Sequence, residues 1–114
     1  MSKIQELLEI NELEKVWEKS TEKPVIVFKQ STTCPISASA FGEFQRFIEN
    51  TETDLAAYYV KVRETRDVSN QIAEELEIQH QSPQILLVKD NKAVWHASHN
   101  KITVDSITDA LKNN

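Results

Sequence analysis

The sequence has a single cysteine among its 114 residues. One thiol can neither close a disulfide within the chain nor supply a multi-thiolate metal site, so both kinds of cross-linked architecture are excluded. No apolar run approaches the 18 residues of a membrane-spanning helix, and the N-terminal region has no apolar block of the length found in secretion signals. We therefore expect a cytoplasmic, reducing location and no membrane partner.

Positive charge is also scarce. Thirteen Lys and Arg residues stand against 18 Asp and Glu residues, which gives a formal net charge of -5. Such a chain has no general basic field to hold a phosphate backbone, so no nucleic-acid partner is expected. The length, the 39% hydrophobic content and the lack of a repeat or linker predict one globular domain, residues 1–114.

Hydrophobic patterning alternates helices and strands along the chain. Short apolar runs predict strands at 25–28, 55–62, 84–89 and 93–97. Apolar residues at helical spacing predict helices over about 11–19, from about residue 34, over about 68–76 and after residue 103, and residues 3–9 are expected to form a separate helical turn. This order predicts an α/β protein of thioredoxin-like topology. Its central mixed sheet would have parallel strands first, a C-terminal antiparallel hairpin last, and helices on both faces.

Candidate capping residues mark the start of three helices. Asn11 with Glu14 three residues later resembles a capping box, and Thr103 is a good N-cap for the last helix. For the helix over 68–76, Asp67 or Ser69 is the expected cap. These residues predict where the helices begin.

The only cysteine, Cys34, follows the buried run 25–28 and directly precedes Pro35. Proline is favoured at the first position of a helix, so Cys34 is the expected N-cap, with its sulfur facing free amide groups. An inert packing cysteine normally lies inside an apolar repeat, whereas Cys34 follows the hydroxyl-rich stretch 31–33. The context therefore favours a reactive thiol over a buried structural one.

The residues around Cys34 can stabilise its thiolate. The amides of Ile36 and Ser37, and the hydroxyl of Thr33 or Ser37, are candidate hydrogen-bond donors, and Pro35 sets the helix start. The helix dipole alone contributes about 0.3–1 kcal/mol, which is too little to bring a thiol from a pKa of about 8.5 to about 6. Hydrogen bonds must supply the remainder.

The string TCPIS at residues 33–37 resembles the Cys-x-x-Cys motif of thioredoxin-like proteins, with Ser37 in place of the second cysteine. It is similar to the motif of the monothiol bacilliredoxins of the YtxJ type, from bacteria that use bacillithiol as their small thiol. The resemblance extends over nearly the whole chain. It implies a thiol–disulfide oxidoreductase with Cys34 as the catalytic residue and bacillithiol as thiol co-substrate, with no metal.

A second motif supports the resemblance. The stretch around Ser82 and Pro83 looks like the thioredoxin segment in which a cis-proline precedes the antiparallel hairpin and faces the active cysteine. An ordinary trans bond is the general expectation, since only about 5–6% of X-Pro bonds are cis. The resemblance implies the cis form, which would leave Ser82 free to bind an extended substrate beside the sulfur.

The implied reaction is removal of bacillithiol from mixed disulfides on client proteins, through a mixed disulfide at Cys34. A second thiol or a disulfide reductase would then release the adduct, because Ser37 cannot resolve it. Two alternatives stay open. One is a non-catalytic carrier in which Cys34 and a small thiol ligate an iron–sulfur cluster, and the other is a redox sensor that becomes bacillithiolated as the signal.

Several other polar residues could contribute to a site. His80, His96 and His99 are expected at the surface, and their spacing does not suggest a metal site. Four cations could neutralise the malate group of bacillithiol, although solvated surface charge is the simpler interpretation; they are Lys29, Lys61, Arg63 and Arg66.

Overall fold

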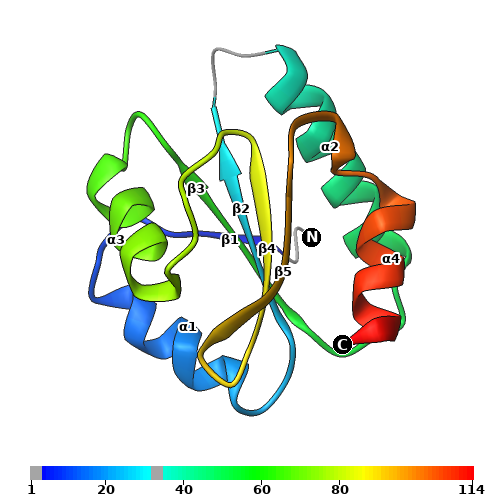
Figure 1. Ribbon diagram of the computed structural model, residues 1–114, viewed down its shortest axis with the longest axis horizontal. Coiled ribbons are helices and arrows are strands. Elements are labelled where there is room, and N and C mark those ends of the chain that lie inside the picture. Colours follow the sequence, from blue (N-terminus) through cyan, green and yellow to red (C-terminus); the bar gives the residue numbers. More distant parts are fainter. Residues whose placement is uncertain (1–3, 32–34) are drawn as a thin grey trace.

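The computed structural model describes residues 4–31 and 35–114 (Figure 1). Its helices and strands are, in order, β1 (Ile4–Glu6), α1 (Glu12–Ser20), β2 (Val25–Gln30), α2 (Pro35–Asn50), β3 (Ala56–Lys61), α3 (Arg66–Leu76), β4 (Gln84–Lys89), β5 (Lys92–Ser98), a 3-10 turn (His99–Lys101) and α4 (Val104–Asn113). The strands form one sheet in the order β1-β3-β2-β4-β5.

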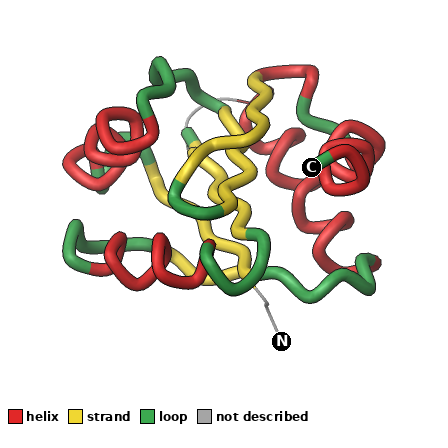
Figure 2. The backbone as a smooth tube through the Cα atoms, turned by 60° about the horizontal axis from the view of Figure 1, so that its bottom comes forward, coloured by secondary structure: helices red, strands yellow, loops and turns green. Residues whose placement is uncertain are grey.

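The sheet is mixed, and β2 lies at its centre. β1, β3 and β2 run parallel, β4 pairs antiparallel with β2, and β5 pairs antiparallel with β4. Helices α1 and α3 cover one face, and α2 and α4 cover the other, so the molecule has three layers (Figures 1 and 2). The predicted thioredoxin-like topology, with 25–28 as a central strand, is confirmed.

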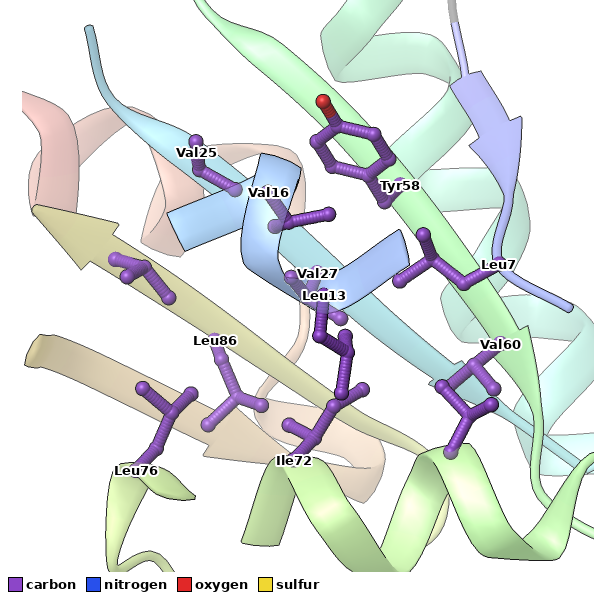
Figure 3. Close-up of a cluster of buried hydrophobic side chains, with 12 residues drawn as sticks. Leu7, Leu13, Val16, Val25, Val27, Tyr58, Val60, Ile72, Leu76 and Leu86 are labelled. Atoms are coloured by element: carbon purple, nitrogen blue, oxygen red, sulfur yellow. The ribbon is translucent and has the colours of Figure 1, made fainter. Parts of the chain in front are cut away.

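Alternate residues of β2 supply both halves of the core. Val25 and Val27 point into the layer beneath α1 and α3, where they join Leu13, Val16 and Ile72 (Figure 3). Burial of these branched side chains on a pleated surface explains why this stretch forms a strand.

On the opposite face of the sheet, Ile26 and Phe28 lie under α2 and α4. The ring of Phe28 stacks on that of Phe44, with centroids 5.4 Å apart, and meets Phe41 edge-on at 5.2 Å. These aromatic contacts dock α2 against β2, which fixes the position of the helix start relative to the strand end.

The expectation of a helical turn over residues 3–9 is wrong. Residues Ile4–Glu6 form the edge strand β1, which pairs with β3 in the register Ile4↔Ala57. The Tyr59 hydroxyl donates to Glu6 Oε1 at 3.1 Å and adds a side-chain link between the two strands. Pairing with a strand some fifty residues away overrides the local helical pattern.

The capping predictions have mixed outcomes. Thr103 caps α4 as predicted: its Oγ1 accepts from the Ser106 amide, and the Ser106 hydroxyl accepts from the Thr103 amide, both at 3.0 Å. The capping box of Asn11 with Glu14 is wrong, because the Asn11 side chain makes no capping bond. Glu12 instead accepts from the main-chain amides just before α1, at 2.8 and 2.9 Å.

The predicted caps of α3 are also wrong. The helix begins at Arg66, after Thr65, so Asp67 and Ser69 lie within its first turn. The Asp67 carboxylate accepts from the amide of its neighbour Val68 at 2.9 Å. A carboxylate at this position still interacts favourably with the helix dipole.

Among the described residues, no helix is long and apolar enough to span a membrane.

Candidate active site

The described residues of the predicted site lie at one end of the sheet. β2 ends there, α2 begins there, and the chain enters β4 there after crossing from α3 (Figure 1). In the sheet, Gln84 pairs with Lys29, so the residue that follows Pro83 lies opposite a residue near the end of β2. Segments far apart in the sequence are therefore neighbours at this end.

The start of α2 is attached to the end of β2 by a hydrogen bond. The Ser31 amide donates to Ser37 Oγ at 2.8 Å, and Ser37 is fully buried. Pro35 is the first residue of the helix, as predicted, and Ile36 beside it is 51% exposed. Cys34 and Thr33, including the predicted N-cap role of Cys34, lie outside the described residues.

The Ser82-Pro83 peptide bond is cis, as predicted from the sequence. Pro83 is buried, and its carbonyl accepts from the His99 amide at 3.1 Å, which ties it to the residue after β5. Ser82 Oγ is buried and has no hydrogen-bond partner in the part of the chain described. A buried hydroxyl without a partner is rare in native proteins and is common at functional sites.

The side chain of Gln84 forms two hydrogen bonds with the loop that precedes Pro83. Its side chain is buried, with the amide nitrogen donating to the Gln79 carbonyl at 3.1 Å and the oxygen accepting from the Gln81 amide at 3.4 Å. A buried amide that bonds to two main-chain groups restricts the loop conformation. No signal in the sequence marked Gln84 for this role.

Lys29 is fully buried, so the interpretation of this residue as solvated surface charge is wrong. Its Nζ lies 3.1 Å from Nδ1 of His80, in the loop between α3 and β4. Burial lowers the Lys29 pKa from 10.5 to about 8. The pKa of His80 is lowered by its own burial, by the charge of Lys29 and by that of Arg66.

These pKa directions fix the protonation of the pair at neutral pH. Lys29 is mostly protonated and donates, while His80 is neutral and accepts at Nδ1. His80, His96 and His99 are all exposed, as predicted. The sequence signal for the pair was a lysine following four consecutive apolar residues of a strand.

Among residues 4–31 and 35–114, no group of three or more His, Cys, Asp or Glu side chains is arranged to hold a metal ion.

Solved structures that are similar to this one have the thioredoxin fold. A structure described as a candidate oxidoreductase with a thioredoxin fold has 36% sequence identity and a TM-score of 0.83, covering 95% of this chain and 93% of that one. Thioredoxin f from spinach chloroplast has 13% identity, a TM-score of 0.76 and coverages of 98% and 86%. Schistosoma mansoni thioredoxin has 19% identity, a TM-score of 0.75 and coverages of 98% and 95%.

The fold and the family comparisons together define a class: the protein is a thioredoxin-fold thiol–disulfide oxidoreductase. A family model described as monothiol bacilliredoxin BrxC matches residues 5–107. The chain belongs to the monothiol bacilliredoxin family, as its TCPIS motif predicted, and the family implies bacillithiol as a thiol substrate.

Proposed function

We propose that this protein removes bacillithiol from mixed disulfides on client proteins, with Cys34 as the nucleophile. The observation that carries the proposal is the start of α2 at Pro35, the residue that follows the only cysteine in the sequence. This helix start lies at the end of the sheet where the chain enters β4 (Figure 1). The family match over residues 5–107 supports bacillithiol as the group transferred.

The reaction is a thiol–disulfide exchange in two steps. The Cys34 thiolate attacks the bacillithiol sulfur of the mixed disulfide, a new S–S bond forms, and the client leaves as a thiolate that takes a proton from water. A second thiol, either free bacillithiol or a reductase cysteine, then attacks the adduct and restores Cys34. The second step needs an external thiol because the chain has no other cysteine.

The first turn of α2 supplies the groups that stabilise the thiolate in this proposal. The amides of Ile36 and Ser37 are among the first of the helix, which have no partner within it, and Pro35 has no amide hydrogen. The Ser37 hydroxyl accepts from Ser31 and keeps its own proton for donation. With the Thr33 hydroxyl, these groups favour the charged sulfur.

The other side of the proposed site binds the substrate. Ser82 and Pro83 would present the backbone of an extended client segment to Cys34. The unpartnered Ser82 hydroxyl supports this assignment, because a bound polar group would complete its hydrogen bonding. The exposed side chain of Ile36 offers the client an apolar contact beside the sulfur. The client proteins and the disulfide reductase act in the cytoplasm in this proposal.

The decisive experiment follows bacillithiol by mass. A client protein carrying one bacillithiol is mixed with an equal amount of the reduced protein under anaerobic conditions, and both are weighed intact. We expect the client to lose bacillithiol while the oxidoreductase gains it. In the matched control, Cys34→Ser, neither mass should change.

Two results would contradict the proposal. If Cys34→Ser restores the client thiol at the wild-type rate, the cysteine is not the nucleophile. If the client itself becomes disulfide-linked to Cys34 and no bacillithiol adduct ever appears, attack falls on the client sulfur. In that case the chain traps clients rather than freeing them.

A further inference from the structure

The loop between α3 and β4 is attached to the sheet by two buried polar side chains. Lys29 of β2 and Gln84 of β4 are paired in the sheet, and both are buried. Gln84 bonds to the Gln79 carbonyl at 3.1 Å and to the Gln81 amide at 3.4 Å. Between these two loop residues, Nδ1 of His80 lies 3.1 Å from the ammonium nitrogen of Lys29. Three consecutive loop residues are therefore each held by a side chain of the sheet.

Of these three attachments, the one through His80 depends on pH. The amide of Gln84 does not titrate, whereas the contact of Lys29 with His80 needs a protonated lysine and a neutral imidazole. The lowered pKa of His80 and the pKa of about 8 for Lys29 meet both conditions at neutral pH. Lys29 is buried but His80 is exposed, so protons from the solvent can reach the imidazole.

Protonation of His80 replaces this hydrogen bond with a repulsion. Nδ1 then carries a hydrogen directed at the ammonium group of Lys29, and neither nitrogen can accept. Two positive charges would face each other across 3.1 Å, at a site where the lysine is shielded from water. The repulsion is relieved when the loop moves His80 away from Lys29 and into the solvent.

The groups that α3 presents to the pair do not offset this repulsion. Arg66 adds a further positive charge, which itself lowers the pKa of His80 after burial and the charge of Lys29. Ser69 Oγ lies 3.5 Å from His80 Nδ1 and is neutral. The carboxylate of Asp67 accepts from a main-chain amide of its own helix. Protonation of His80 therefore brings together three positive charges.

The neighbouring strands supply no compensating charge either. The residues paired with Lys29 are Val60 of β3 and the uncharged Gln84 of β4. The titratable residue after β5, His99, donates its main-chain amide to the Pro83 carbonyl, on the far side of the loop. Among the described residues, no carboxylate forms an ion pair with Lys29 or His80.

We propose that Lys29 and His80 form a pH switch, which holds residues 79–81 against the sheet at neutral pH and releases them when His80 is protonated. The loop leads directly into Ser82 and Pro83, so its release also frees the segment that enters β4. That this release would weaken client binding in an acidified cell rests on the proposed function. The switch itself does not.

The experiment follows hydrogen exchange of the Gln81 main-chain amide by NMR between pH 7 and pH 5.5, corrected for the intrinsic exchange rate. Release lets His80 titrate near its ordinary pKa of 6.5, so acid favours the open loop. We expect protection of the Gln81 amide to fall about three- to eightfold over this range. The amides of the central strand β2 should keep their protection.

Two histidine variants show which group takes up the proton. His80→Asn retains a neutral acceptor for Lys29 but does not titrate in this range, so the acid response of Gln81 should disappear. The matched control is His99→Asn, on the other side of Pro83. Asparagine tolerates the positive φ of 56° at residue 99, and this variant should respond to acid as the wild type does.

Two lysine variants test the role of the buried charge. In Lys29→Met, a side chain of similar size without the charge, His80 can be protonated in place, so the acid response should be smaller than in the wild type. Lys89→Met removes a lysine from the end of β4 that is distant from the loop, and should retain the full response.

Three results would overturn the proposal. Protection of the wild-type Gln81 amide could stay constant from pH 7 to pH 5.5, or His80→Asn could keep the acid response. An equal loss of protection in β2 would mean that acid unfolds the whole molecule rather than the loop. None of these measurements involves a thiol, so failure of the switch leaves the proposed function standing, and the switch stands if the proposed function fails.

Discussion

At the scale of single residues, Cys34 follows β2 and is bonded to the first residue of α2. Free amides at a helix start and neighbouring hydroxyl groups both favour a thiolate. We expect Cys34 to titrate well below the ordinary thiol value of about 8.5. Thiolate absorbance against pH measures this directly, with Cys34→Ser as the blank. A midpoint at or above 8.5 would exclude an activated nucleophile.

Lys29 gives the stability of the protein an unusual pH dependence. Its pKa is about 8 in the folded chain, and 10.5 is the ordinary value. Between these values the unfolded chain binds more protons, so the free energy of unfolding should rise as the pH increases from about 8 to about 10.5. The full difference corresponds to about 3 kcal/mol.

Urea unfolding across this pH range measures the effect. Wild type should gain stability relative to Lys29→Met between pH 8 and 10, and Lys29→Met should be the more stable protein at pH 7. Comparison of the two proteins cancels the tyrosines, because the raised pKa values of Tyr58 and Tyr59 are common to both. Parallel stability curves would show that the Lys29 pKa is close to 10.5.

The sequence singled out the two motifs of the proposed site but not the connections between residues around them. The TCPIS string and Ser82-Pro83 were recognised, and the cis bond was predicted correctly. The Lys29–His80 pair was missed because its members are 51 positions apart and meet only when β4 joins β2. A charged residue directly after an apolar run can be exposed or buried. For Lys29, the position of α3 determines which of the two occurs.

At the scale of elements, α4 and α1 provide a matched test of helix capping. Thr103 forms a reciprocal capping box with Ser106, whereas Asn11 makes no capping bond with its side chain. We expect Thr103→Ala to lower the free energy of unfolding by about 1 kcal/mol, the usual effect of losing an N-cap. Asn11→Ala should change it by less than about 0.5 kcal/mol.

Urea unfolding of the two alanine variants compares the same kind of substitution in one protein. Equal losses would mean that the Thr103 and Ser106 hydrogen bonds contribute little. A larger loss for Asn11→Ala would mean that the Asn11 side chain caps α1 in solution.

Prediction succeeded for elements whose signal is local. The runs of β2 and β4 are apolar on both faces, and each was placed within two residues of its observed bounds. β1 was missed because three residues with one apolar member show no period, and the strand exists only by pairing with β3. The Asn11 cap failed because main-chain carbonyls already bond the amides at the start of α1: Glu12 donates to the Glu9 carbonyl and Leu13 to that of Ile10.

At the scale of the whole molecule, the two core layers share their strands. Val27 belongs to one buried cluster and Phe28 to the other. Because both clusters are built on the same strand, loss of packing in one layer should also disrupt the packing of the other. We expect one cooperative unfolding transition. The two tryptophans test this, because Trp17 packs against the layer under α1 and α3, and Trp95 against the layer under α2 and α4.

Single-tryptophan variants make the test specific. In Trp95→Phe the fluorescence reports on Trp17, and in Trp17→Phe it reports on Trp95. Within each variant, the urea midpoint from fluorescence should equal the midpoint from far-UV circular dichroism. Different midpoints would show that one helical layer detaches before the other.

The order of the strands along the sequence also has a consequence for the nascent chain during translation. Cys34 leaves the ribosome 49 residues before Pro83, an interval of about 2–10 s at ordinary rates of synthesis. Throughout that interval the thiol exists while β4, Gln84 and the bond to His80 do not. An unfinished chain therefore carries a thiol without most of the groups that would surround it in the finished fold. We expect translation to deliver a protein that begins to exchange disulfides only when its last strands are in place.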